Sequence, residues 1–142
     1  MKLADFKHVF DFPRRHNAVY VFFCVYDNIE RPFYIGETDS FSSRMGDYLR
    51  ANFKAPTDFK VGEAIRYLMA HENIRIRVGF QECDDRQSAR IQQNQIIETL
   101  RKEGVRLMND LRGYNYRAGT DEVNERKRVC KFCDDNILST GS

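Results

Sequence analysis

The sequence predicts an α+β fold, within the broad α/β class, in which helices flank a small three-stranded mixed sheet. A run of β-branched and aromatic residues predicts a central strand, and a later stretch of strictly alternating polarity predicts another. Three segments with helical periodicity lie among the strands. The chain has 142 residues, of which 42% are hydrophobic and 31% charged, so it is long enough for one domain with a core and too short for two ordinary ones.

The predicted strands differ in how they are buried. Residues 18–26 are apolar on both alternating faces, which is typical of a central strand covered on two sides. Asp27 and Asn28 supply turn chemistry, so residues 33–36 are expected to return as the second strand of a hairpin. Residues 74–80 alternate between apolar and polar side chains and predict a half-buried strand.

Helix signals fill the rest of the expected domain. Residues 38–40 can cap a helix over 41–53, and residues 56–58 can open a second one over 59–71. A third helix is expected over 86–103, capped by Asp84 and Asp85 and closed by Gly104. We therefore divide the chain into three parts, which are an N-terminal extension packing on the core (1–17), a domain (18–111), and a C-terminal extension with a polar tail (112–142).

The composition sets only broad limits on the protein's cellular location and on its partners. The start has no apolar signal-peptide core, and the longest apolar run, 18–26, is far shorter than the ~20 residues of a membrane helix. We expect an intracellular protein, cytoplasmic or nuclear, that has no membrane segment and is a monomer or weak dimer. The net charge of +2 neither requires nor excludes a nucleic-acid partner.

Four side chains suited to phosphodiester chemistry lie in or just after the predicted hairpin. Tyr20 lies within the first strand, Tyr34 lies at the end of the second, and Arg44 and Tyr48 share a face of the following helix. Gly36 lets the backbone turn without a side-chain clash. Cleavage needs a deprotonated water, a cation on the phosphate oxygens and positive charge at phosphorus, and the planar fork of arginine suits the last role.

These residues resemble the motifs of the GIY-YIG nuclease family. The first motif is Ala-Val-Tyr at 18–20, and the second is Tyr-Ile-Gly at 34–36, followed by Thr38. Arg44, Tyr48 and Asn109 follow in the family's order, so the resemblance covers roughly residues 18–109. Asn109 is interpreted as a structural hydrogen-bonding residue.

The resemblance implies a metal-dependent endonuclease that hydrolyses nucleic acid, most naturally DNA. Tyr20 would activate the water, Tyr34 would help to bind phosphate or water, and Arg44 would stabilise the pentavalent transition state; Tyr48 is weighed evenly between packing and phosphate contact. A glutamate on the third helix would hold one Mg²⁺ or Mn²⁺.

The expected metal ligand is where the sequence departs from the family. In the family, this helix carries a small residue, a glutamate and an aliphatic residue at intervals of four. The corresponding residues here are Ala89, Gln93 and Ile97. A glutamine carbonyl has no charge, and hard cations favour carboxylates. A gapped alignment would place Glu98 near the position of the family's glutamate, but the helical wheel puts Glu98 on the face opposite the apolar stripe. Glu37 is a further alternative carboxylate.

Two functions therefore stay open. The first is an active nuclease, favoured because Tyr20, Tyr34 and Arg44 are retained together. The second is a catalytically degenerate scaffold that recognises nucleic acid or a protein, favoured by Gln93 and the modest net charge. Candidate nucleic-acid contacts, each equally well read as a solvated surface residue, are Arg14, Arg15, Arg75 and Arg77.

The C-terminal cysteines raise a third, weaker hypothesis of a zinc-dependent interaction domain. Cys130 and Cys133 have the spacing of half a zinc site, but no second pair with diagnostic spacing follows. We expect two ordinary thiols and no Zn²⁺ there. Cys24, inside an apolar strand, is expected to be a buried small residue.

Overall fold

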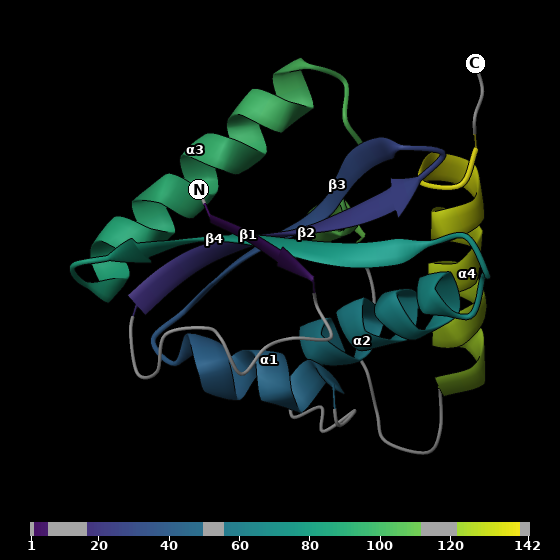
Figure 1. Ribbon diagram of the computed structural model, residues 1–142, viewed down its shortest axis with the longest axis horizontal. Coiled ribbons are helices and arrows are strands. Elements are labelled where there is room, and N and C mark those ends of the chain that lie inside the picture. Colours follow the sequence, from purple (N-terminus) through teal and green to yellow (C-terminus); the bar gives the residue numbers. More distant parts are fainter. Residues whose placement is uncertain (1, 6–16, 50–55, 112–121, 140–142) are drawn as a thin grey trace.

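One antiparallel sheet with helices on both faces organises the protein (Figure 1). The computed structural model describes residues 2–5, 17–49, 56–111 and 122–139. The strands are β1 (Lys2–Asp5), β2 (Asn17–Tyr26), β3 (Ile29–Thr38) and β4 (Arg75–Cys83). They lie in the order β1-β4-β2-β3, so β2 and β4 are central and β1 and β3 are the edges.

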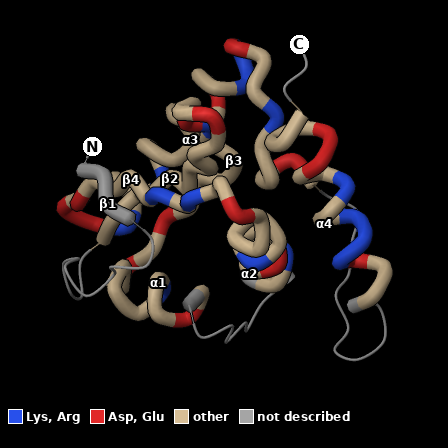
Figure 2. The backbone as a smooth tube through the Cα atoms, turned by 45° about the vertical axis from the view of Figure 1, so that its right-hand side comes forward, with Lys and Arg blue, Asp and Glu red and all other residues tan. Residues whose placement is uncertain are grey.

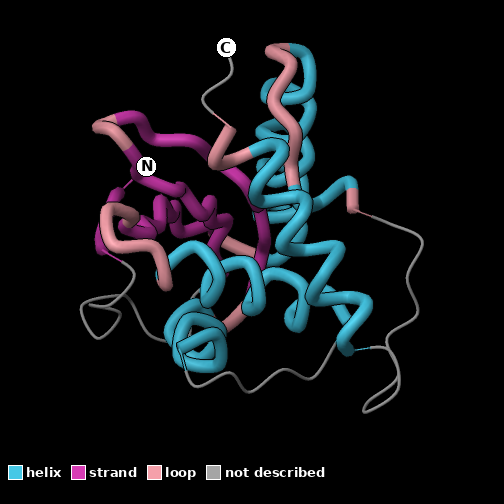
Figure 3. Tube along the Cα trace, turned by 90° about the vertical axis from the view of Figure 1, so that its right-hand side faces the viewer, coloured by secondary structure: helices cyan, strands magenta, loops and turns pink. Residues whose placement is uncertain are grey.

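Helices cover the two faces unequally. They are α1 (Phe41–Leu49), α2 (Pro56–Met69), α3 (Arg86–Lys102), the 3-10 turn η2 (Met108–Asp110) and α4 (Glu122–Asn136). Figure 1 shows α3 on one side of the sheet and α1 and α2 on the other. Figure 3, turned to bring α4 forward, shows it beside α2, against which it packs. None of the described helices is long and apolar enough to cross a membrane.

The α+β prediction is confirmed, with two corrections to the sheet. All three strand pairings are antiparallel, so the expected mixed sheet is wrong. β3 and β4 do run in the same direction, but β2 lies between them and pairs with both. In addition, the N-terminal extension supplies a fourth strand, since β1 pairs with β4 from Lys2↔Phe80 to Asp5↔Arg77.

The hairpin of β2 and β3 contains a register shift that places the motif residues. Asp27 and Asn28 have φ of 53° and 61°, as a tight two-residue turn of the I′ type requires. Phe23 lies opposite Pro32, whereas Phe22 lies opposite Tyr34, so Phe33 is an extra residue in β3. This is a β-bulge, and it brings the consecutive residues Phe33 and Tyr34 into the same core cluster.

The core lies on both sides of β2, as predicted for a central strand. Its alternate residues Tyr20, Phe22 and Cys24 belong to the larger cluster, which side chains of α1, α2 and α4 complete. Val19 and Val21 belong to the smaller cluster, with Ile35, Ile97 of α3 and Leu107. The sheet therefore separates two apolar layers, and a side chain's position along a strand decides which helices it meets.

The helix α4 lies in the segment that the sequence predicted only as a C-terminal extension with a polar tail. Only a sparse set of its side chains is apolar and buried, namely Val129, Phe132 and Cys133, with Ile137 just beyond its end. Those side chains join the larger core cluster. The helix was not predicted because charged residues outnumber apolar ones along it, so its apolar stripe is narrow.

Both predicted ends of α3 are confirmed. The Asp85 carboxylate accepts a hydrogen bond from the Ser88 backbone N–H at 2.7 Å, as an N-cap does. At the other end, Gly104 has φ of +84°, and the Val105 N–H donates to the Leu100 carbonyl at 3.0 Å. These bonds form the left-handed closing turn that favours glycine.

We expect Asp85→Ala to lower the melting temperature near neutral pH. The hydrogen bond from Ser88 holds the pKa of the Asp85 carboxyl below its ordinary value. Its contribution is therefore fully present above that ordinary value and is lost as the pH falls through the lower, folded-state pKa. Thermal unfolding at neutral and acidic pH tests this, because the gap between wild type and Asp85→Ala should close at low pH. Asp85→Asn, a neutral cap, should lie between them.

Candidate functional site

Three of the four predicted catalytic side chains gather on the face of the sheet that α1 and α2 cover. Tyr20 and Tyr34 lie on adjacent strands with ring centroids 6.3 Å apart. Tyr48 approaches from α1, and its hydroxyl lies 3.4 Å from the Tyr20 hydroxyl. That separation exceeds the roughly 2.7–2.8 Å usual for hydroxyl pairs, so the contact is weak. The rings are 2%, 8% and 5% exposed for Tyr20, Tyr34 and Tyr48, so the cluster is mainly internal.

Aromatic neighbours fix these rings in place. Phe22 meets Tyr48 edge-on at 5.3 Å and stacks with Tyr34 at 6.3 Å. Phe41, the first residue of α1, lies 5.9 Å from the Tyr20 ring. Edge-on and offset contacts of this kind stabilise ring pairs beyond their burial. The tyrosines therefore hold α1 against the sheet.

Gly36 is required by the Tyr20 ring. The two residues are directly opposite in the β2–β3 pairing. A Cβ atom at position 36 would lie 2.3 Å from Cζ and 2.4 Å from the hydroxyl oxygen of Tyr20. The ring thus lies across the bare backbone of Gly36, which is a different role from the predicted release of the chain into a turn.

The passage from β3 into α1 positions Arg44. Thr38, 3% exposed, accepts a hydrogen bond from the Ser40 N–H on its side-chain oxygen at 3.0 Å. The Arg44 N–H then donates to the Ser40 carbonyl at 3.0 Å, which starts the helix. Arg44 is partly buried and lies one turn before Tyr48. The tyrosine cluster and Arg44 thus share α1, and the convergence of the Arg44 guanidinium with the tyrosines stays a prediction.

Asn109 is a structural clamp, as interpreted from the sequence. Its Oδ1 accepts from the Ile35 N–H at 3.0 Å, and its Nδ2 donates to the Ile35 carbonyl at 2.7 Å. β3 is an edge strand, so these backbone groups face outward from the sheet. The amide side chain completes both bonds, and it holds the strand that carries Tyr34 and Gly36.

The two candidate metal ligands on α3 lie behind the sheet relative to the tyrosines. Gln93 falls on the helix face defined by the buried Ala89 and Ile97, and Ile97 packs with the smaller core cluster. It is partly buried. Glu98 is 70% exposed and lies 3.6 Å from Lys102 as an ion pair. The wheel prediction that Glu98 faces solvent is confirmed.

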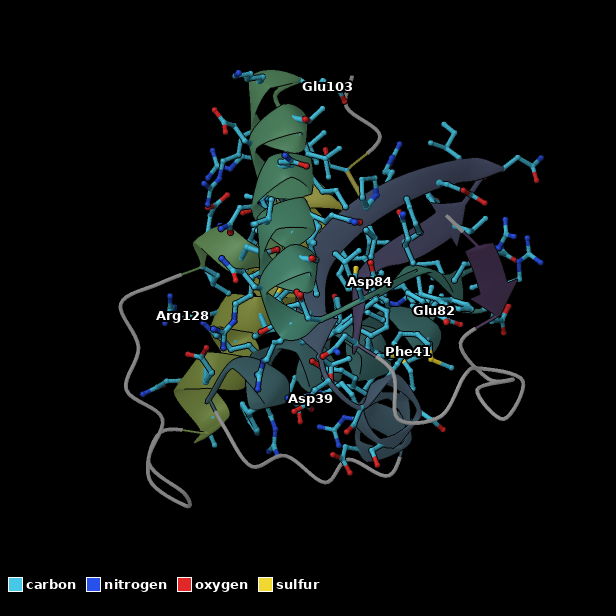
Figure 4. The ribbon with its side chains drawn as sticks, turned by 90° about the vertical axis from the view of Figure 1, so that its left-hand side faces the viewer. Asp39, Phe41, Glu82, Asp84, Glu103 and Arg128 are labelled. Carbon is cyan, nitrogen blue, oxygen red and sulfur yellow. The ribbon has the colours of Figure 1, made fainter. Side chains whose placement is uncertain are left out.

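Glu37 also lies on the α3 side, where two arginines bind it. It is paired with Val19 in the sheet register, and Val19 belongs to the α3-side cluster. Its carboxylate lies 3.3 Å from Nε of Arg86 and 3.4 Å from Nε of Arg90. Arg86 also lies 3.5 Å from Asp39, and Figure 4 shows Asp39 below the first turn of α3, with Glu103 at the helix's far end. The Glu37 charge is thus compensated by guanidinium groups.

These ligands do not fit a divalent cation held beside the tyrosines. A hard cation such as Mg²⁺ prefers carboxylate oxygens, but Gln93 offers a neutral amide, Glu37 is paired with two arginines, and Glu98 points to solvent. All three project on the α3 side, whereas Tyr20 faces α1. Within the described ranges, no three His, Cys, Asp or Glu side chains are grouped so that they could hold a metal.

Two of the four candidate nucleic-acid contacts, Arg75 and Arg77, are not on the tyrosine face either. Arg77 pairs with Phe23 in the register and forms an ion pair with Glu30, and Arg75 pairs with Val25. Both arginines share the α3 side with the alternate residues of β2. Two further candidates, Arg14 and Arg15, lie outside the described residues.

Burial shapes the chemistry of the thiols of Cys24, Cys130 and Cys133. Cys24 and Cys133 are fully buried, as expected for Cys24, and burial raises their pKa values to about 11 and about 12. Burial also raises the pKa of Cys130. Metal binding needs thiolates, so these environments disfavour zinc at the Cys130–Cys133 pair.

The arginine pair that binds Glu37 was not predicted from the sequence. Arg86 and Arg90 are four residues apart at the start of α3, which is a detectable helical spacing, but nothing in the sequence indicates that Glu37 faces them.

Comparisons with family models, with curated proteins and with solved structures find no protein that matches this chain.

Proposed function

We propose that this protein is a nucleic-acid-binding domain on a GIY-YIG-like scaffold and that it lacks a working metal site. One observation carries the choice of binding over cleavage. Tyr20 and Tyr34 belong to the core cluster on the α1 side of the sheet, and Arg44 lies on α1 itself. Gln93 lies on α3, and Glu37 pairs with arginines of α3. A sheet between a phosphate and its metal ligand leaves no common contact point.

Arg44 is the residue on which binding depends in this proposal. Ring contacts of Phe41 and Tyr48 with the sheet fix α1. Arg44 lies one turn before Tyr48 and is partly buried. A guanidinium positioned by a rigid element can bind two phosphate oxygens at once. Arg75 and Arg77, on the other face, would contact a different stretch of nucleic acid or none.

A second candidate, a metal-dependent nuclease acting on DNA, is favoured by one specific arrangement. The hydroxyls of Tyr20 and Tyr48 lie 3.4 Å apart beside Tyr34, and a domain that only binds has less use for three hydroxyls at one place. A bound Mg²⁺ or Mn²⁺ would have to supply an acidified water, and the available ligands do not fit that ion.

Binding can be measured by fluorescence anisotropy with labelled single-stranded and double-stranded DNA in chelator. We expect Arg44→Ala to weaken binding by about tenfold and to reduce the salt dependence by about one counterion, because one charge-assisted phosphate contact is lost. Arg106→Ala is the matched control: Arg106 is an exposed arginine beyond the end of α3, and its loss should change binding less than about twofold. Equal binding by wild type and Arg44→Ala would contradict the proposal.

Cleavage of supercoiled plasmid with Mg²⁺ or Mn²⁺ separates the two candidates. We expect wild type and Gln93→Glu both to leave the plasmid intact. Wild-type cleavage that disappears in Tyr20→Phe and in Arg44→Ala would establish the nuclease instead. Cleavage gained by Gln93→Glu would mean that position 93 reaches the phosphate, which contradicts the separation by the sheet.

A further inference from the structure

A fully buried carboxylate lies in the contact between α4 and α2. Glu125 has an exposed fraction of 0%. Its Oε2 accepts a hydrogen bond from Nη1 of Arg128 at 3.1 Å, but its Oε1 has no hydrogen-bond partner in the part of the chain that the structure describes. An ionised carboxylate can accept several hydrogen bonds, and leaving one buried oxygen without a protein partner is costly when the group is charged.

The charged groups around Glu125 come from both helices. Lys60 of α2 interacts with it electrostatically, although the Lys60 ammonium donates its hydrogen bond to the Leu111 carbonyl at 2.6 Å. A neighbouring group on the same two helices consists of Glu63, 8% exposed, with Arg66 at 2.7 Å and Arg126 at 3.4 Å. Figure 2 shows that both α2 and α4 carry positive and negative residues.

Burial outweighs these cations in setting the protonation of Glu125. Burial raises the pKa of the Glu125 carboxyl above its ordinary value of 4.5, against the opposing effects of Arg128 and Lys60. The same burial lowers the pKa of Lys60. When α4 leaves α2, water solvates the carboxylate and this penalty disappears. The docked helix thus holds the Glu125 proton more tightly than the undocked helix does.

We infer that α4 is a pH-sensitive latch on the core, which packs most firmly when Glu125 is neutral and loosens when Glu125 ionises. The stabilisation is fully present below the ordinary glutamate pKa and is lost as the pH rises through the higher pKa of the docked state. Loosening would expose the buried side chains that α4 brings to the core, including Val129 and Cys133. This device is independent of nucleic-acid binding.

Amide hydrogen exchange between about pH 4 and about pH 8 tests the latch. After correction for intrinsic exchange rates, protection of α4 should fall with rising pH relative to α3. The fall should not exceed about tenfold per pH unit, because a single proton is linked. In Glu125→Gln, which cannot ionise, protection of α4 should be independent of pH and match the low-pH wild type.

A matched control is available at the same interface. Glu63→Gln also removes a buried carboxylate between α2 and α4, but it leaves Glu125 in place, so it should keep the pH dependence of the wild type. Wild-type protection of α4 that does not change with pH would overturn the inference, whether or not Glu125→Gln folds. A pH dependence that persists in Glu125→Gln would overturn it equally.

Discussion

Gly36→Ala is expected to destabilise the protein by about 1–3 kcal/mol or more, the range for forcing extra atoms into a packed core. The new methyl carbon would lie 2.3 Å from Cζ of Tyr20, and that ring is 2% exposed and touches Phe22 and Phe41. The ring cannot move aside without disturbing the contact that holds α1. The midpoint of urea unfolding measures the loss.

Two controls separate this steric effect from the general cost of replacing glycine. At Gly104 a Cβ atom would meet nothing within 4 Å, and only the φ of +84° opposes alanine, so Gly104→Ala should cost about 1 kcal/mol. In the double variant Gly36→Ala with Tyr20→Ala, the clash is gone. The double variant should therefore lose clearly less unfolding free energy than the two single variants lose together. Simple additivity would show that the ring does not meet position 36.

Asn109→Ala is expected to cost about 2 kcal/mol or more. It removes both side-chain partners of the Ile35 backbone, and each group left unsatisfied costs about 1–3 kcal/mol, less where water can replace the partner. Ile35 is fully buried, and its bonds to Asn109 measure 3.0 Å and 2.7 Å. Urea unfolding gives the loss, and exchange of the Ile35 amide hydrogen should accelerate.

A graded variant distinguishes the clamp from mere packing. Asn109→Asp keeps the acceptor for the Ile35 N–H but loses the donor to the Ile35 carbonyl, so its stability should lie between wild type and Asn109→Ala. Asn94→Ala, at an exposed amide on α3, should be close to neutral. An Asn109→Asp protein as stable as wild type would show that the bond to the carbonyl contributes nothing.

Strong local patterns made most of the fold predictable. The apolar run in β2 and the caps of α3 at Asp85 and Gly104 follow from residue chemistry over a few positions. β1 and α4 were missed because their stability comes from partners distant in sequence. β1 pairs with β4, and α4 packs through a narrow stripe that includes Val129 and Phe132. Charged residues between the members of that stripe hide it in the sequence.

The candidate site was predictable only in part. The sequence shows which residue types are present, but the side of the sheet on which each of them lies depends on the whole fold. The motifs placed Tyr20, Tyr34 and Tyr48 together, and the structure brings these side chains to one face. The apolar stripe of α3 correctly placed Gln93 toward the sheet. The side of the sheet on which α3 packs depends on the whole topology, so the separation of Gln93 from the tyrosines could not be read from the helix alone.

The extra residue in β3 decides which side of the sheet Tyr34 faces. Beyond Phe33, each residue of β3 is shifted by one relative to the register set by the turn at Asp27 and Asn28. In a strictly regular hairpin, Tyr34 would face Val21 and emerge on the α3 side, because neighbours along a strand point in opposite directions. As long as the two-residue turn is kept, Tyr34 therefore stays on the side of Tyr20 only because β3 carries this extra residue.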